Sequence, residues 1–381
     1  MSLQGVRIAA IFGGVSPEHE ISVITACQAM PVLAQLGARV VPVYITKQGR
    51  WLTDPAFSEL STFRRGLPEE GDPLSLDLDA GALRQGAPSR LRPARELAVD
   101  VLFPLTHGGH GEDGVLAALA EVARIPTVGA GVLAGALAMD KFRSKQLLQA
   151  QGLPVVPARL ARGSEQARAA AADMPLPLVV KPNRSGSSIG VSLVTAEAEL
   201  EDAITLAFQF DSEVVVEPAV EGAQDLNCAV RSSGAPAVSE VERPLKGTGV
   251  LSYSDKYAPQ GQLLPKSEAE SGKGDARREL PAAISPELRQ EIQRLSQAAF
   301  MLLGCRGTAR VDFLLSADGD LFVNEVNTIP GSLAFYLWEA SGVDFATLLE
   351  DLVREALAPP AELQAVLPGN LLAEDALLGK R

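Results

Sequence analysis

Four polar side chains of a predicted β-hairpin have the residue types of a magnesium site. The Asp-Gly dipeptide at 318–319 is a strong signal for a two-residue turn. With that turn, Asp312 faces Glu325. Arg310 faces Asn327 in the same register, and alternation along the strands places all four side chains on one face. Opposed carboxylates repel unless a cation compensates them, and Mg²⁺ accepts carboxylate and amide oxygens beside nucleotide phosphates. A solvated face with an arginine salt bridge is the alternative, but the added amide and arginine favour the metal site.

A lysine and a loop of small residues have the composition of a phosphate site. Lys181 ends an apolar strand expected over 178–181, and the following loop contains Ser187 among other serines and glycines. Backbone N–H groups and hydroxyls of such loops bind phosphates while a lysine supplies charge. The loop lacks the Walker A pattern, so an ordinary Gly/Ser hairpin is the alternative. Lys141, at the start of a helix expected over 140–152, is either a second phosphate ligand or a surface residue.

Two glycine turns follow strands expected near the N-terminus. Glu18 comes shortly after Gly13-Gly14, and His107 begins a His-Gly-Gly-His-Gly run. Ligands bind at the carboxyl ends of strands in open α/β sheets. Glu18 either contacts a substrate or only complements the dipole of its helix. His107 and His110 lack a third metal ligand, so we do not expect a zinc site.

The elements that position these residues predict three domains. Residues 1–133 are expected to form an α/β domain around a buried parallel sheet, with strands over 6–12, 40–45 and 99–105. Residues 134–222 are expected to form a smaller α+β unit, with strands near Val155 and over 178–181, 191–194 and 213–217 and a helix over 197–210. Residues 223–381 contain expected strands over 225–231 and 237–242, a helix over 286–304 and the hairpin. The predicted class is therefore mixed α/β and α+β.

Composition excludes several kinds of partner. The 34 basic and 47 acidic residues give a net charge of −13, which argues against nucleic-acid binding. The most apolar run, over 125–139, is shorter than the roughly 20 residues of a membrane helix, and the five apolar residues 8–12 are too few for a signal peptide. Cys27, Cys228 and Cys305 lack disulfide or metal spacing, so we expect a cytoplasmic protein without membrane partners.

Seven segments are distributed over nearly the whole chain: GGVSPEHEIS from Gly13, THGGHGEDG from Thr106, AMDKFRSK from Ala138, VVKPNRSGSSIGV from Val179, YSDKY from Tyr253, RGTARVDF from Arg306 and NEVNTIPG from Asn324. Together and in this order they resemble the D-alanine–D-alanine ligase family of the ATP-grasp superfamily. The resemblance implies an ATP-grasp fold and an enzyme that joins two D-alanines through an acyl phosphate, for peptidoglycan precursors and thus the cell wall. We also expect a homodimer.

The resemblance assigns a nucleotide and metal site. Lys141 and Lys181 would hold phosphates of ATP below Ser187, and Lys256 would reach the γ-phosphate. Glu217 and the backbone after it would contact adenine, and Asp225 would take the place of the family's ribose-binding glutamate after a one-residue insertion. Two Mg²⁺ ions, for which Mn²⁺ could substitute, would be bound by Asp312, Glu325 and Asn327.

The resemblance also assigns residues to the two amino acids. Glu18 would bind the ammonium of the first D-alanine, oriented by Ser187 and Tyr257, and His107 would lie near its carboxylate. Arg310 and the N–H of Gly331 would stabilise the oxyanion.

One departure affects the second amino acid. Family members place a serine five residues after the Pro-Gly glycine to hold the acceptor carboxylate, and this chain has Tyr336 there. Either the phenol points away and Ser332 with the backbone binds the acceptor, or the phenol reshapes the pocket. The alternatives to D-alanine are therefore D-serine, D-lactate or another amino acid as acceptor. A non-catalytic nucleotide-binding regulator is the alternative of a different class.

Overall fold

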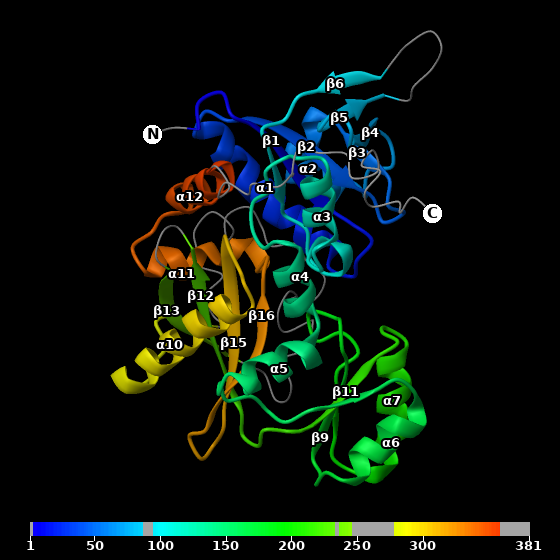
Figure 1. The fold of residues 1–381 in the computed structure, drawn as a ribbon, viewed down its shortest axis with the longest axis vertical. Helices are drawn as coiled ribbons and strands as arrows, with labels where there is room; N and C mark the ends of the chain where they lie inside the picture. The colour runs from blue at the N-terminus through cyan, green and yellow to red at the C-terminus, as the bar shows by residue number, and fades with distance from the viewer. Residues whose placement is uncertain (1–2, 87–93, 233–235, 246–277, 359–381) are drawn as a thin grey trace, which may run out of the picture.

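The structure is a computed structural model that describes residues 3–86, 94–232, 236–245 and 278–358. Its strands form three sheets (Figure 1). In the described residues, no helix is long and apolar enough to cross a membrane.

The N-terminal sheet has seven strands in the order β6-β5-β4-β3-β2-β1-β7. Its parallel part consists of β1 (Arg7–Gly13), β2 (Arg39–Ile45) and β7 (Val101–Pro104), which confirms the predicted buried parallel strands. The segment between β2 and β7 extends the same sheet with antiparallel strands β3 (Trp51–Thr53), β4 (Asp72–Asp77), β5 (Ala82–Gln85) and β6 (Arg95–Leu97). The helical elements of this region are α1 (His19–Gln35), η1 (Pro55–Ser58), α2 (Leu60–Arg64), η2 (Gly109–Gly111) and α3 (Val115–Val122).

The second sheet is antiparallel and has the order β10-β9-β11-β8. Its strands are β8 (Arg159–Ala161), β9 (Leu178–Pro182), β10 (Ser192–Val194) and β11 (Val214–Pro218). Helices α6 (Ser164–Ala172) and α7 (Leu200–Phe208) pack on it, with the short η3 (Glu197–Glu199) before α7. The strand predicted near Val155 is wrong, because Val155 makes only an isolated bridge with Val323 of the third sheet.

The third sheet has the order β14-β13-β12-β15-β16. Its strands are β12 (Gln224–Arg231), β13 (Ala237–Pro244), β14 (Arg278–Glu279), β15 (Thr308–Leu315) and β16 (Leu321–Asn327). Helix α10 (Pro286–Leu302) covers it, and η4 (Gly331–Ala334), α11 (Phe335–Ala340) and α12 (Phe345–Leu357) follow the hairpin.

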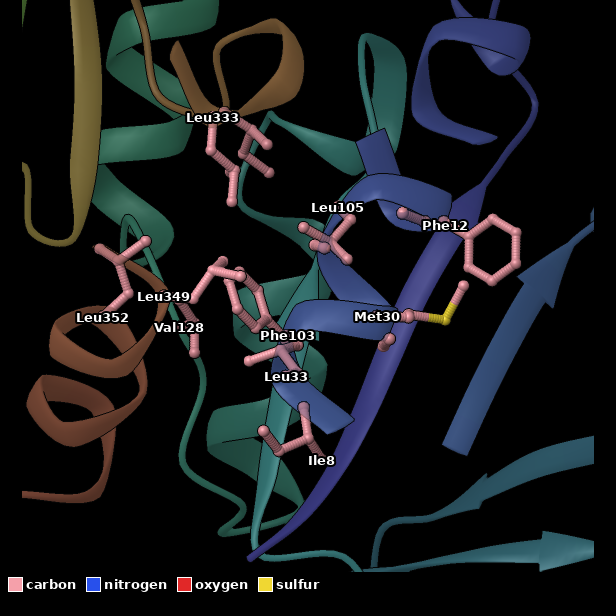
Figure 2. Packing of buried hydrophobic residues seen from close by; sticks show 14 of the residues in the cluster. Ile8, Phe12, Met30, Leu33, Phe103, Leu105, Val128, Leu333, Leu349 and Leu352 are labelled. Atoms are coloured by element: carbon pink, nitrogen blue, oxygen red, sulfur yellow. The ribbon is translucent and has the colours of Figure 1, made fainter. Parts of the chain in front are cut away.

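The hydrophobic cores join elements that are distant in the sequence. Figure 2 shows Leu349 and Leu352 of α12 in one cluster with Phe103 of β7 and Leu33 of α1. Helices α4 (Val132–Met139) and α5 (Lys141–Ala150) contribute to the core of the third sheet. Packing thus crosses both predicted boundaries, at 133/134 and 222/223, and the three-domain division stays a prediction.

In the hairpin of β15 and β16, the polar residues of the site pair as predicted, although the turn differs from the predicted one. Asp312 pairs with Glu325, and Arg310 pairs with Asn327, as predicted. The predicted two-residue turn is wrong, because Leu315 pairs with Leu321 and the loop spans residues 316–320. A register shift between Asp312 and Phe313 compensates for the longer loop. The apolar face of the hairpin is buried on the core, and this burial sets the strand register at the polar residues of the opposite face.

Candidate active site

The metal residues predicted on the hairpin lie together. Nε and Nη2 of Arg310 donate to the two carboxylate oxygens of Asp312 at 2.6 and 2.7 Å. Nδ2 of Asn327 donates to the same carboxylate at 3.1 Å, and Nζ of Lys141 lies 3.2 Å from Oε2 of Glu325. Each of the two opposed carboxylates is thus paired with a cation, Asp312 with Arg310 and Glu325 with Lys141.

This donor set fits Mg²⁺ only when other oxygens complete the coordination. In the part of the chain that the structure describes, no group of three or more His, Cys, Asp or Glu side chains could hold a metal by itself. Mg²⁺ prefers six oxygens and is commonly bound by one or two carboxylates together with substrate phosphates. The hairpin therefore offers a site for a metal that arrives with a nucleotide.

The predicted phosphate lysine Lys141 begins helix α5 beside the Ser/Gly loop. The carboxylate of Asp140 caps this helix by accepting from the backbone N–H of Arg143 at 2.8 Å. The Lys141 N–H donates to the carbonyl of Asn183 at 3.2 Å, and its Nζ donates to the carbonyl of Ser185 at 2.6 Å. Lys141 therefore links the loop to Glu325 of the hairpin.

A buried ion cluster lies next to this loop. Both Lys181 and Lys145 donate to the carboxylate of Glu217, and the Lys145 Nζ to Oε2 distance is 2.5 Å. All three residues are buried. Burial alone would raise the pKa of Glu217, but the two lysines hold it below its usual value. Burial also lowers the pKa of Lys145 to about 8. The sequence analysis did not identify Lys145. Its spacing of about one helical turn from Lys141 could have indicated that both lysines lie on the same face of the helix.

Glu18 is buried, and the Ser187 hydroxyl donates to its carboxylate. Two glycines make room for this contact. A Cβ built on Gly108 would lie 2.6 Å from Oε2 of Glu18, and one on Gly186 would lie closer still. The structure thus joins the first glycine-rich turn to the Ser/Gly loop, two segments that the sequence suggested separately.

His107 and Glu112 complete the wall of this region from the second glycine-rich turn. Burial, opposed by a backbone hydrogen bond with Ile329 and assisted by the charge of Arg310, lowers the pKa of His107 to about 4, so the imidazole is neutral. Burial and the nearby Glu18 raise the pKa of Glu112 to about 8. Sequence reasoning did not single out Glu112, although it lies in the quoted segment THGGHGEDG.

One pocket brings seven of the predicted site residues together: Glu18, His107, Ser187, Arg310, Glu325, Asn327 and Gly331. It holds about 380 Å³ of space, partly open to solvent. Its lining comes from all three sheet regions and consists of Glu18, His107, Glu112, Gly186, Ser187, Arg310, Glu325, Asn327, Ile329, Pro330 and Gly331.

Comparison with known proteins agrees with this arrangement. Residues 7–130 match the family model described as the D-ala D-ala ligase N-terminus, and residues 147–354 match the D-ala D-ala ligase C-terminus. The chain belongs to the D-alanine–D-alanine ligase family. Its members are ATP-dependent ligases with the ATP-grasp fold, so the predicted family, fold class and enzyme class are confirmed.

Individual relatives cover nearly the whole chain. The D-alanine–D-alanine ligase of Mycobacterium sp. (strain KMS) is 39% identical over 93% of this chain and 97% of its own length, and that of Thermosipho africanus is 33% identical over 91% and 92%. Among solved structures, the VanG D-Ala:D-Ser ligase from Enterococcus faecalis has a TM-score of 0.76 at 29% identity, covering 93% of this chain and 100% of that one. The D-alanine-D-alanine ligase from Coxiella burnetii has a TM-score of 0.75 at 28% identity, covering 93% and 94%.

The residue that departs from the family pattern faces β13. The Tyr336 hydroxyl donates to Oε2 of Glu242 at 3.1 Å, and the Arg278 guanidinium lies 4.1 Å from the centre of the phenol ring. Burial and Glu242 raise the pKa of the phenol. Among the described residues, neither Tyr336 nor Ser332 lines the pocket. The Ser332 N–H donates instead to the hydroxyl of Thr25 at 3.0 Å.

Other predicted residues also do not line this pocket: Lys141, Lys181, Glu217 and Asp312 make the contacts given above. Asp225 is near the start of β12, where it pairs with Leu314, and its ribose contact stays a prediction. Lys256 and Tyr257 lie outside the described residues.

Proposed function

We propose that this ligase of the D-alanine–D-alanine ligase family joins two D-alanines in the cell-wall pathway, converting ATP to ADP and phosphate. The observation that carries the proposal is one pocket in which the Glu18 carboxylate, the Arg310 guanidinium, the Gly331 backbone and the hairpin residues Glu325 and Asn327 meet. An ammonium anchor, an oxyanion site and a metal–phosphate site are the parts that an acyl-phosphate ligase needs within reach of one carboxylate.

In the first step, the carboxylate of the first D-alanine attacks the γ-phosphorus of ATP, and ADP leaves. Glu18 binds the ammonium of this D-alanine, and Ser187 holds Glu18 in place. Lys141 and Lys181 are the proposed phosphate ligands. Asp312, Glu325 and Asn327 would hold Mg²⁺, which neutralises charge on the phosphates when bound. Lys141 pairs with Oε2 of Glu325 in this structure, so a metal at that oxygen would compete with the lysine.

In the second step, the amine of the second D-alanine attacks the acyl carbon, the new C–N bond forms and phosphate leaves. Arg310 and the Gly331 N–H would stabilise the oxyanion of the tetrahedral intermediate. Asp312 already holds the Arg310 guanidinium through two parallel hydrogen bonds, so the donor is pre-oriented.

D-Serine is the second candidate acceptor, and two observations favour testing it. A close structural neighbour is a D-Ala:D-Ser ligase, and Tyr336 replaces the family serine. Measuring ADP release with D-alanine as sole amino acid, with L-alanine as control, tests the main proposal. Turnover with D-alanine supports it, whereas turnover only after D-serine or D-lactate is added would move the assignment to that acceptor. No turnover with any acceptor would favour the regulator.

We propose a cytoplasmic homodimer with no nucleic-acid or membrane partner, and two Mg²⁺ ions that Mn²⁺ can replace. Sedimentation of the purified protein measures the oligomeric state, and turnover against Mg²⁺ and Mn²⁺ concentration measures the metal requirement.

A further inference from the structure

Thr25 connects parts of the pocket without lining it. It lies on α1 about two helical turns after Glu18, on the same face, and it is fully buried. Its Oγ1 accepts from the Ser332 N–H at 3.0 Å and lies 2.8 Å from Nε2 of His107. A threonine hydroxyl can accept one hydrogen bond and donate another at the same time.

The protonation state of His107 defines the direction of the second bond. The imidazole is neutral, because burial lowers its pKa to about 4. A backbone hydrogen bond with Ile329 raises that pKa, which identifies the ring as the donor to a carbonyl there. The other ring nitrogen of a neutral imidazole is an acceptor. The Thr25 hydroxyl therefore donates to Nε2 of His107.

These bonds hold both ends of the short segment that contains Gly331. His107 holds the segment at Ile329, and Thr25 holds it at Ser332. Because Thr25 also contacts His107, the two attachments form one closed ring of hydrogen bonds around the Gly331 backbone. Pro330 and Gly331 lie inside that ring and line the pocket.

The backbone after Gly331 needs such support. Ser332, Leu333 and Ala334 have φ values of 51°, 54° and 52° in succession. This left-handed conformation is unfavourable for residues with a Cβ, and it persists only where the surroundings impose it. Leu333 and Ala334 are buried in the hydrophobic core, and the contact with Thr25 is the polar attachment at the start of the turn.

We infer that Thr25 is a positioning residue that aligns the oxyanion donor Gly331 and the substrate residue His107 as one unit. The inference rests on the proposed function. Loss of the hydroxyl frees the Ser332 N–H and leaves His107 without its donor, so the Gly331 N–H moves relative to the acyl carbon. The ATP contacts do not depend on this ring, because Lys141 and Lys181 are held by the Ser/Gly loop and by Glu217.

The experiment compares Thr25→Val with Thr25→Ser, which keeps the hydroxyl, and with the control Thr308→Val. Thr308 is also buried, and its hydroxyl accepts from Nε1 of Trp338 at 3.3 Å outside the pocket described above. Removing an oxyanion donor typically lowers kcat about 10²–10³-fold, so displacing one should lower it about 10–100-fold in Thr25→Val. Thr25→Ser should recover most of the rate. KM for ATP should stay within about twofold of the wild type in all three variants, since the lysine contacts are retained.

A spectroscopic measurement separates positioning from general destabilisation. The chain has only three histidines, so the ring ¹⁵N signals of His107 can be assigned. Thr25→Val should shift its Nε2 signal, whereas Thr308→Val should not. If Thr25→Val does not fold, Thr25→Ala removes the same hydroxyl without placing a methyl against the imidazole.

Three results would overturn the inference: a wild-type kcat in the folded variant without the hydroxyl, equal impairment of Thr25→Ser, or an equal loss of kcat in Thr308→Val. Failure of the proposed function is distinguishable, because the wild-type protein itself would then show no turnover with D-alanine.

Discussion

Replacing Lys145 by methionine tests the buried ion cluster beside the proposed nucleotide site. The change removes one of the two cations on Glu217 and keeps an apolar side chain of similar length in a site where Lys145 is 3% exposed. It also removes a weaker contact, at 3.4 Å, from Nζ to the carbonyl of Val156. Lys181 remains on the other carboxylate oxygen.

The remaining partner determines the size of the effect. Breaking a buried ion pair costs about 3–5 kcal/mol when it leaves an uncompensated charge, and a hydrogen bond to a charged group contributes about 1.5–3 kcal/mol. Since Lys181 still neutralises Glu217, we expect Lys145→Met to lower the free energy of unfolding by about 2 kcal/mol. Glu217→Gln leaves two buried lysines without an anion, so we expect it to cost about 3–5 kcal/mol.

Urea denaturation of the wild type and both variants measures these costs, with the slope of the transition checking that each still unfolds in two states. KM for ATP should rise in Lys145→Met while KM for D-alanine does not, because Glu217 and Lys181 are on the proposed nucleotide side. A cost below about 0.5 kcal/mol for Lys145→Met, or a cost above that of Glu217→Gln, would refute the reasoning.

Three further changes test the pocket. Glu325→Gln should abolish turnover without unfolding the protein, because it weakens Mg²⁺ binding and removes the surface-accessible charge that pairs with Lys141. A wild-type rate at ordinary Mg²⁺ would contradict the metal assignment. The pKa of His107 is about 4 in the folded protein against 6.5 unfolded, so the unfolded state binds this proton more strongly. The contribution of His107 to the free energy of unfolding should therefore fall by about 3 kcal/mol as pH drops from 6.5 to 4, and the difference between the pH profiles of the wild type and His107→Gln measures it. Tyr336→Phe removes a hydroxyl that bonds to Glu242, so it should cost about 1–2 kcal/mol of stability and leave the acceptor KM unchanged; a large rise in that KM would place the phenol at the acceptor.

The local alternation of apolar and polar residues was sufficient to predict the hairpin and its pairing at the site. Alternation of apolar and polar residues places Val311 and Val326 in the core, and that burial sets the register of Asp312 and Glu325 on the other face. The turn was predicted wrongly, yet the pairing at the site was right, because a register shift compensates for the longer loop. The buried parallel strands and the capped helix beginning at Lys141 were predictable for the same reason, since their signals lie within a few residues of each other.

The contacts between segments were decided by the tertiary structure. Ser187 and Glu18 are 169 positions apart, Lys145 and Glu217 are 72 apart, and Ser332 and Thr25 are 307 apart. Hydrophobic periodicity reports only which face of an element is buried, and motif resemblance supplies roles only for residues that the motif already names.

Tyr336 shows, in one residue, the difference between what the sequence determines and what the tertiary structure decides. The sequence determined that an aromatic residue replaces a serine after the Pro-Gly turn. Where the phenol points depends on Glu242, brought from β13 to 3.1 Å from its hydroxyl by the pairing of the third sheet. A buried hydroxyl must find a partner, and only the packed structure defines which partner is within reach.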